Sequence, residues 1–401
     1  MAARKDALFI PDVPDASSGF HALAEEARQS ADPVSAALGM YLFSNAAWLA
    51  WEMQQGGFDR IVFIARDGWW VKQAYDIIAP SLGVGVPSDY VRISRQAAFP
   101  LHFRTAEDLT GLSDLVDVTA HTPDTLNQLL APEIRLEEMP ELMAHYGVRP
   151  DERLTGGVPD GLLEAWRSAW DQERADQYRE HARAYIAPKF SGKCATFDVG
   201  YHLRSESVIC KLTGADVTAF VTHVDGDKPP ERGVPYRALY GRSPLVSWVA
   251  REQFLLEDAP LCTGYGETGP MFSSGKAGMH PSIRHCQQSA LDFVKRIVKK
   301  YGCTLAAMPL RPADGCLPFE HFLHCGPYRL MKPFRGNSFE NAFHAGAAEE
   351  DGAFLQWRLM QTDLLLVQGV PAWRVRLKRA LIRLREDPEG FWRKLKSFAS
   401  E

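Results

Sequence analysis

The chain lacks the cysteine pattern of a metal-binding or disulfide-stapled protein. Its 401 residues include seven cysteines, and no two of them form a Cys-x-x-Cys pair. Without that spacing the sequence predicts neither a zinc site nor a disulfide framework. Scattered free thiols are typical of a reducing cytoplasm, which is where we expect the protein to act.

Membrane-spanning, secretory and nucleic-acid-binding patterns are also missing. No apolar stretch approaches the roughly 20 residues that a transmembrane helix needs, and the segment Met1 to Asp6 lacks the apolar core of a signal peptide. The formal net charge is −5, so no global basic excess points to a nucleic-acid partner. At 46% hydrophobic and 24% charged residues, the composition is that of an ordinary globular protein.

The glycine-rich stretch Cys262 to Pro270 is not a Walker loop, because the Lys-Ser/Thr ending is absent. We predict a mobile loop near the site for residues 262–285. Residues 304–345 contain many prolines and glycines, and we predict irregular structure for them.

One stretch organises the rest of the chain. The apolar run Ile61 to Ala65 predicts a strand buried on both faces, as in a parallel sheet. Arg66, Asp67 and Gly68 follow at once, and a helical pattern begins behind them. Ligands bind at the carboxyl ends of strands in open α/β sheets, where such turns lie. An ordinary surface turn with a paired Arg and Asp is the alternative.

Two further predicted strands end in polar motifs. The strand 90–93 is followed by Ser94 and Arg95, and the strand 195–197 is followed by Asp198 and Gly200. Two arginines at matching strand ends favour a shared pocket for phosphate or carboxylate oxygens. A fourth strand, 217–221, leads into a polar stretch with His223, Asp225 and Asp227, which we interpret as a solvated loop.

These patterns predict an α/β fold with a mostly parallel sheet flanked by helices, a helical insertion and a helical C-terminal tail. We expect the core over residues 33–104 and 188–260, with a helical insertion or lid over 105–187. An accessory region with mobile loops would cover 261–370, and a basic amphipathic tail 371–401. Within the insertion, residues 114–130, 136–146 and 162–186 are predicted to be helical.

The motifs resemble a known family when they are taken in order. Phe63-Ile64-Ala65-Arg66-Asp67-Gly68, then Tyr90 to Arg95, then Phe197-Asp198-Val199-Gly200 are similar to the glycan phosphoribosyltransferases of bacterial surface-polysaccharide synthesis. The resemblance spans roughly residues 35 to 270. Leu255-Leu256-Glu257 and the later Gly-Tyr-Gly are also similar, more faintly.

The resemblance implies a phosphoribosyltransferase-like fold, phosphoribosyl diphosphate as donor and a glycan hydroxyl as acceptor, which a lipid can carry. Such domains often follow a haloacid-dehalogenase-type phosphatase that removes the 5-phosphate. This chain shows no Asp-x-Asp phosphatase motif upstream, so we expect the phosphatase to be a separate protein. Asp198 also stands alone where ordinary phosphoribosyltransferases have two adjacent acids.

Each motif residue receives an expected role on this basis. Phosphoribosyl transfer needs cations on the diphosphate, usually Mg²⁺, and a carboxylate near the ribose or the acceptor. Asp67 and Asp198 are the expected catalytic and metal-binding residues. The expected substrate-binding residues are Arg66, Gly68, Ser94, Arg95, Gly200, Ser205, Ser207 and Glu257.

Two other functions stay open. A haloacid-dehalogenase-like phosphohydrolase would need a nucleophilic Asp where this chain has Ala65, which excludes covalent carboxylate catalysis at that position. A non-catalytic scaffold of glycan assembly could use the same pocket or the tail.

The tail, residues 371–398, alternates apolar residues with nine Arg and Lys between Arg374 and Lys396. This pattern predicts a basic amphipathic helix broken at Pro388. Peripheral attachment to the inner face of the cell membrane is one use of such a helix. Packing on the core with a solvated basic face is the other.

Overall fold

The computed structural model describes residues 13, 15–224, 233–241, 248–274, 279–335, 353–362 and 369–392. Its strands are β1 (Arg60–Ile64), β2 (Ser88–Val91), β3 (Lys193–Asp198), β4 (Asp216–His223), β5 (Tyr236–Tyr240), β6 (Cys262–Gly266) and β7 (Gly269–Phe272). Its α-helices are α2 (Ser18–Arg28), α3 (Pro33–Gly56), α4 (Gly68–Ser81), α5 (Arg95–Ala98), α6 (Leu112–Leu115), α7 (Pro123–Leu130), α8 (Met139–His145), α9 (Asp160–Ala169), α10 (Gln172–Ile186), α11 (Arg204–Thr213), α12 (Trp248–Leu255), α13 (Pro281–Tyr301), α14 (Pro312–Cys325), α15 (Tyr328–Met331), α16 (Ala353–Met360) and α18 (Ala372–Glu386). Short 3₁₀ helices are η2 (Pro100–His102), η3 (Ala106–Gly111), η4 (Val118–Ala120), η5 (Leu136–Glu138), η6 (Ala187–Lys189), η7 (Gly302–Ala307) and η8 (Lys332–Phe334).

The central sheet is parallel throughout its five strands, in the order β2-β1-β3-β4-β5. The predicted α/β class with a parallel sheet flanked by helices is therefore confirmed, and all four predicted strands are present. Since the strands are parallel, their carboxyl ends meet at one edge. The chain runs from β1 outward to β2 and then returns to β3 on the other side of β1. That reversal makes the β1–β3 boundary the topological switch point, where open α/β sheets bind ligands.

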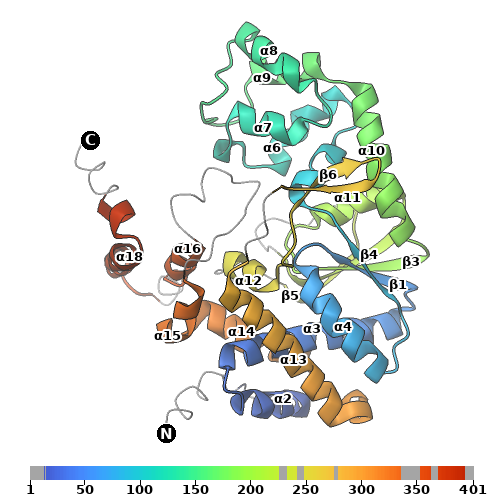
Figure 1. Ribbon diagram of the computed structural model, residues 1–401, viewed down its shortest axis with the longest axis vertical. Helices are drawn as coiled ribbons and strands as arrows, with labels where there is room; N and C mark the ends of the chain where they lie inside the picture. The colour runs from blue at the N-terminus through green and yellow to red at the C-terminus, as the bar shows by residue number, and fades with distance from the viewer. Residues whose placement is uncertain are drawn as a thin grey trace.

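Helices cover both faces of the sheet (Figure 1). Alternate residues of the strands face one helical layer or the other. Phe63 and Phe197 join the larger core with α3, α4, α13 and α14. Val62 and Cys194 face the opposite side, in a smaller core with α10 and α11. This period of two explains why β1 is apolar at nearly every position: both of its faces are covered.

Helix α3 has clear start and stop signals. Asp32 accepts a hydrogen bond from the Ser35 backbone N–H at 3.1 Å, Pro33 occupies the first turn, and Gly57 ends the helix with φ +60°. A capping carboxylate and a first-turn proline favour the start of a helix, and a glycine in the left-handed conformation favours its end. The helix between them is buried on most sides because α4, α13 and α14 all pack on it.

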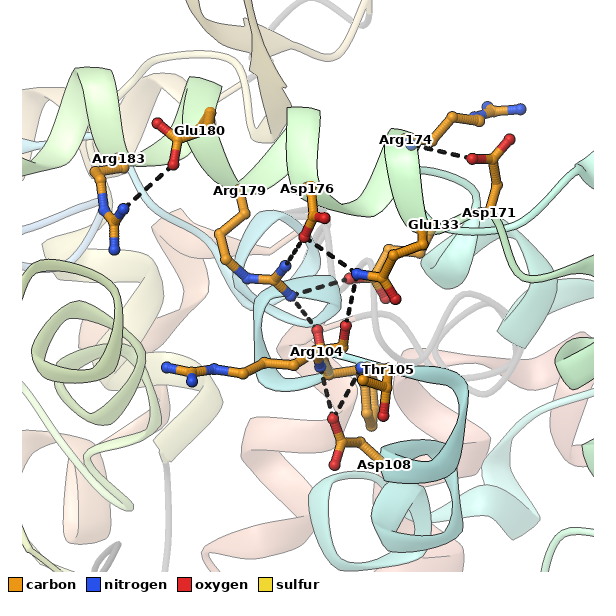
Figure 2. Close-up of polar contacts among 12 residues, drawn as sticks. Arg104, Thr105, Asp108, Glu133, Asp171, Arg174, Asp176, Arg179, Glu180 and Arg183 are labelled. Carbon is orange, nitrogen blue, oxygen red and sulfur yellow. Dashed lines mark hydrogen bonds and ion pairs between the residues drawn. The ribbon is translucent and has the colours of Figure 1, made fainter.

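The helices from α6 to α9 have a hydrophobic core of their own, which includes Phe103, Leu126 and Trp166. Helix α10 packs on the sheet through the smaller core, and its polar side chains reach toward residues 104–108 and Glu133 (Figure 2). Arg179 reaches from α10 to the carbonyl oxygen of Phe103, to Asp176 at 3.2 Å and to Glu133 at 3.9 Å. Burial raises the pKa of Glu133 well above its usual range.

Two local predictions were wrong, and one predicted helical segment is divided in two. Residues 162–186 form two helices, α9 and α10, because the chain extends at Trp170 and Asp171 caps α10. Residues 262–272 form the β6–β7 hairpin, which packs on α10, where a loop was expected. Within 304–345, residues 312–325 are the helix α14, with Pro312 in its first turn.

Gly200 provides a test of the packing at the sheet edge. Its φ is +138°, and a Cβ there would overlap the carbonyl oxygen of His223 on β4. We expect Gly200→Ala to destabilise the protein by about 2–4 kcal/mol, since overpacking adds to an unfavourable backbone conformation. Gly214 is the matched control, with φ +69° and no atom within 4 Å of its Cβ position. Gly214→Ala should lower the free energy of unfolding, measured by denaturant titration, by only about 1–2 kcal/mol. Equal losses in the two variants would contradict the proposed steric clash.

Candidate functional site

The turn after β1 places Asp67 at the start of α4. Asp67 lies at the N-cap position of α4, yet its side chain makes no capping hydrogen bond. Gly68 follows with little space around it, because a Cβ would lie 3.2 Å from the Cβ of Phe63 and 3.4 Å from the carbonyl oxygen of Phe197. A glycine here lets α4 begin close to both β1 and β3.

The turn after β3 brings a second carboxylate to the neighbouring position. Asp198 accepts a hydrogen bond from the Val199 backbone N–H at 2.7 Å, and Gly200 then passes against the carbonyl of His223. The chain enters α11 through Leu203, whose φ is +59°. Glu206 lies in the first turn of α11 and faces the interior, with 1% of its surface exposed.

The electrostatics place these carboxylates in one cluster. Burial raises the pKa of Asp67 well above its usual range, and the charges of Glu252 and Asp198 raise it further. Burial also raises the pKa of Asp198, with the Glu206 carboxylate as the next cause. Arg95 and Arg66 oppose the shift at Asp67. The parallel strands therefore end at one edge, and the charges of Arg66, Arg95 and Asp198 act on Asp67 there. A ligand pocket shared by these residues stays a prediction.

Glu252 completes the cluster from α12. Its carboxylate lies 3.4 Å from Arg95 Nη2. Burial raises the pKa of Glu252, although Arg95 and Arg251 oppose this shift. The segment after α12 also closes over the β1 turn: Arg66 donates to the carbonyl of Ala259 at 3.2 Å, and the Glu257 backbone N–H donates to the carbonyl of Arg66 at 3.3 Å.

Two predicted substrate-binding side chains have protein partners. Glu257 accepts two hydrogen bonds from Arg92, at 2.6 and 2.7 Å, and one from the Tyr90 hydroxyl at 2.9 Å. Ser94 donates to the carbonyl of Cys262 at 2.5 Å and caps α5 through the Ala97 backbone N–H. These contacts give both residues a structural role, and their binding of substrate stays a prediction.

The remaining predicted residues lie on the approach to α11. Gly200 packs against β4, Ser205 is half-buried in the first turn of α11, and Ser207 is buried beside Glu206. Among the described residues, no hydrogen bond joins the Ser205 or Ser207 hydroxyl to Asp67 or Asp198. Their contact with a substrate phosphate stays a prediction.

Sequence reasoning missed a buried network next to the cluster. Arg251 is fully buried and forms a two-pronged ion pair with Glu320 of α14, including Nε to Oε1 at 2.8 Å. Its Nη1 donates to the Tyr201 hydroxyl at 2.9 Å. His223, interpreted from the sequence as part of a solvated loop, is instead buried, with Nε2 at 3.1 Å from Glu320. The adjacent Asp225 and Asp227 lie outside the described residues.

Glu206, Glu252 and Arg251 gave only weak sequence signals. Glu206 is flanked by Ser205 and Ser207, which were predicted to bind substrate, and Glu252 belongs to no motif in the sequence. Their partners are far along the chain, so the spacing of residues could not reveal the contacts. An acidic residue on an otherwise apolar helix face was the signal available.

The donor set fits Mg²⁺ in part. Asp67 and Asp198 offer hard oxygen ligands at adjacent strand ends, and burial raises the pKa of both well above the usual range. Within the described ranges, however, no group of three metal-competent side chains has the geometry of a metal site. Mg²⁺ commonly takes one or two carboxylates and completes its shell with water and substrate phosphates.

Comparisons with known proteins leave the family open. No protein-family model matches the chain, and no curated protein matches it either. Among the described residues, no helix is both long and apolar enough to cross a membrane.

The carboxyl group of Glu206 should make the stability of the fold depend on pH. Burial raises its pKa from 4.5 to about 7, so the folded protein keeps a proton that the unfolded chain releases near pH 4.5. The resulting stability is present at low pH and is lost as the pH rises toward 7 and above. Without added metal, Glu206→Gln should therefore gain stability relative to wild type between pH 5 and pH 8, by up to about 3 kcal/mol.

The exposed Glu267 is the matched control, because Glu267→Gln should leave this pH dependence unchanged. Denaturant unfolding at several pH values measures both variants. A Glu206→Gln profile parallel to that of wild type would show that this carboxyl does not retain its proton in the fold.

Proposed function

We propose that the protein transfers phosphoribosyl from phosphoribosyl diphosphate to a hydroxyl of a glycan acceptor. The observation that carries this proposal is the position of Asp67 and Asp198 at the switch point, with Arg66 and Arg95 in the same cluster. A diphosphate needs cationic groups and a reacting sugar needs a carboxylate, and this edge of the sheet offers both. The sequence resemblance supplies the identity of the donor and of the acceptor class.

Each group in the cluster has a role in this reaction. Arg66 and Arg95 bind the diphosphate oxygens, and Asp67 and Asp198 would hold Mg²⁺, which neutralises the leaving group when bound. The bond between ribose C1 and the diphosphate oxygen breaks, and the diphosphate leaves with the electron pair. The acceptor oxygen forms the new bond to C1, and its proton passes to an ionised carboxylate of the pair, which is Asp198 where Asp67 alone would hold the Mg²⁺.

The excess of acidic groups also fits this function. A carboxylate cluster by itself repels a diphosphate, so donor binding requires either protonated carboxyls or a divalent cation. The raised pKa values of Asp67, Asp198 and Glu252 indicate carboxyls that resist ionisation in the absence of such a cation. We therefore expect donor binding to depend strongly on Mg²⁺.

The rival functions have less support. A phosphohydrolase with a carboxylate nucleophile would need an acid at Ala65, and the Ala65 backbone N–H instead continues the strand pairing to the carbonyl of Val91 at 3.0 Å. A scaffold protein has no need for buried carboxylates whose charges are unbalanced, because each such group costs stability. A separate phosphatase would remove the 5-phosphate, and the reaction would take place in the cytoplasm.

Calorimetry with phosphoribosyl diphosphate, with and without Mg²⁺, tests the proposal directly. Arg66→Ala and Arg95→Ala should weaken donor binding by about 1.5–3 kcal/mol, typical of a hydrogen bond to a charged group. Asp198→Asn keeps the shape of the side chain and should cut transfer by about a hundredfold or more. Sugar nucleotides should not bind in place of the donor.

The control is Arg149→Ala, which removes an exposed arginine in the insertion and should change neither binding nor transfer. Unfolding curves of all variants show whether each remains folded. Unchanged donor binding and turnover in both Arg66→Ala and Asp198→Asn would place the site elsewhere in the protein.

A further inference from the structure

Helix α18 attaches to the rest of the protein by one side only. Val375 and Ile382, one heptad apart, are its buried apolar side chains. On the same side Arg379 Nε donates to the Thr362 hydroxyl at 2.7 Å, and Glu386 lies 3.3 Å from Arg335 Nε. These contacts dock α18 beside α16 at the edge of the molecule (Figure 1). They fix which side of the helix faces the protein and which faces outward.

The outward side carries an apolar stripe. Trp373, Leu377, Leu381 and Leu384 are 62%, 55%, 57% and 38% exposed. Their spacing of four, four and three residues places them in one line along a helix. Packing on the core therefore accounts for two apolar residues of α18 and leaves four in contact with water. A contiguous exposed patch of this kind marks an interaction site more often than a scattered leucine does.

Basic residues border the stripe on both sides. At 100° per residue, Arg374 and Lys378 fall on one flank, and Arg376 and Arg383 fall on the other. The helix holds six Arg or Lys against a single acidic residue, the buried Glu386, whereas the whole chain has a net charge of −5. Basic charge is thus concentrated where the apolar side chains are exposed.

We propose that this face of α18, the stripe Trp373, Leu377, Leu381 and Leu384 with its basic borders, binds an anionic lipid surface. A helix with an exposed apolar line and basic flanks lies in the interface, with its apolar side chains among the acyl chains and its cations at the headgroups. The basic residues then contact lipid phosphates, and each adds to the attraction. This inference is independent of the chemistry at the sheet edge.

A second copy of the chain is the competing occupant of the face. Two copies meeting stripe to stripe would bring their basic borders together, and like charges held close repel. An anionic surface instead offers the complementary charge along both borders. The charge pattern therefore favours lipid over self-association.

Vesicle flotation of the full chain tests the proposal. The protein should float with vesicles of phosphatidylcholine and phosphatidylglycerol at low salt, and much less with phosphatidylcholine alone or at high salt. Leu377→Glu combined with Leu381→Glu should lower the bound fraction by about tenfold or more, because both acyl contacts are lost and two anions are added.

The matched control changes two equally exposed apolar residues elsewhere. Trp51 and Met271 are 57% and 48% exposed, and Trp51→Glu with Met271→Glu should float as wild type does. Retained flotation of the Leu377→Glu, Leu381→Glu protein would overturn the proposal, as would failure of the wild-type protein to float.

A pair of charge-reversal variants tests whether the basic residues of α18 in particular, rather than basic residues anywhere on the protein, carry the lipid binding. Arg376→Glu with Lys378→Glu should reduce flotation, while Lys295→Glu with Lys299→Glu, the same charge change on exposed positions of α13, should not. Equal loss in the two pairs would overturn the assignment to α18. Sedimentation analysis without lipid supplies the last outcome: a wild-type dimer that Leu377→Glu and Leu381→Glu abolish would assign the face to a second copy instead.

Discussion

The burial of several carboxyl groups side by side is the constraint on which the site depends. Asp67, Asp198, Glu206 and Glu252 gather at one edge of the sheet, and burial is the first cause of the raised pKa of each. Removing a carboxylate from water costs several kcal/mol unless a partner compensates it. Such a cluster persists in a fold only where protons or a cation balance it, which is a property of sites that handle charged ligands.

Other buried acids near the cluster are paired with cationic side chains and hydrogen-bond donors. Glu320 receives Arg251 and His223, and although burial opposes its ionised form, these partners lower its pKa below the usual range. Glu257 is likewise held by Arg92 and a tyrosine hydroxyl. Glu206 has the opposite character, since neither carboxylate oxygen has a hydrogen-bond partner in the described structure. Glu133 of the insertion resembles Glu206 in this respect, so a buried acid without a hydrogen-bond partner is not confined to the cluster.

The sequence predicted the part of the site that depends on local pattern. Apolar runs followed at once by polar residues located β1 and β3, and parallel pairing brought Asp67 and Asp198 to one edge. The sequence did not predict β6, because Gly264 is typical of a loop. In the fold, the missing side chain at Gly264 lets Tyr178 and Met271 pack close to the strand. Helix α14 was missed for a similar reason: the absence of a side chain at Gly315 lets the helix approach Ser44, a contact that no local pattern contains. Long-range pairs such as Arg251–Glu320 are set by the tertiary fold alone.

The site and the exposed face of α18 are joined through packed helices. Glu252 of the cluster lies on α12, and Phe254 on the same helix contacts Trp357 of α16 with ring centroids 6.0 Å apart. Helix α16 in turn packs against α18. Aromatic side chains buried in a close-packed core leave little freedom between the elements that they connect. If α18 rests on a lipid surface, this connection sets the height and orientation of the sheet edge above it. A lipid-linked glycan would then meet the strand-end carboxylates from a fixed direction, whereas a free glycan would gain nothing from the arrangement.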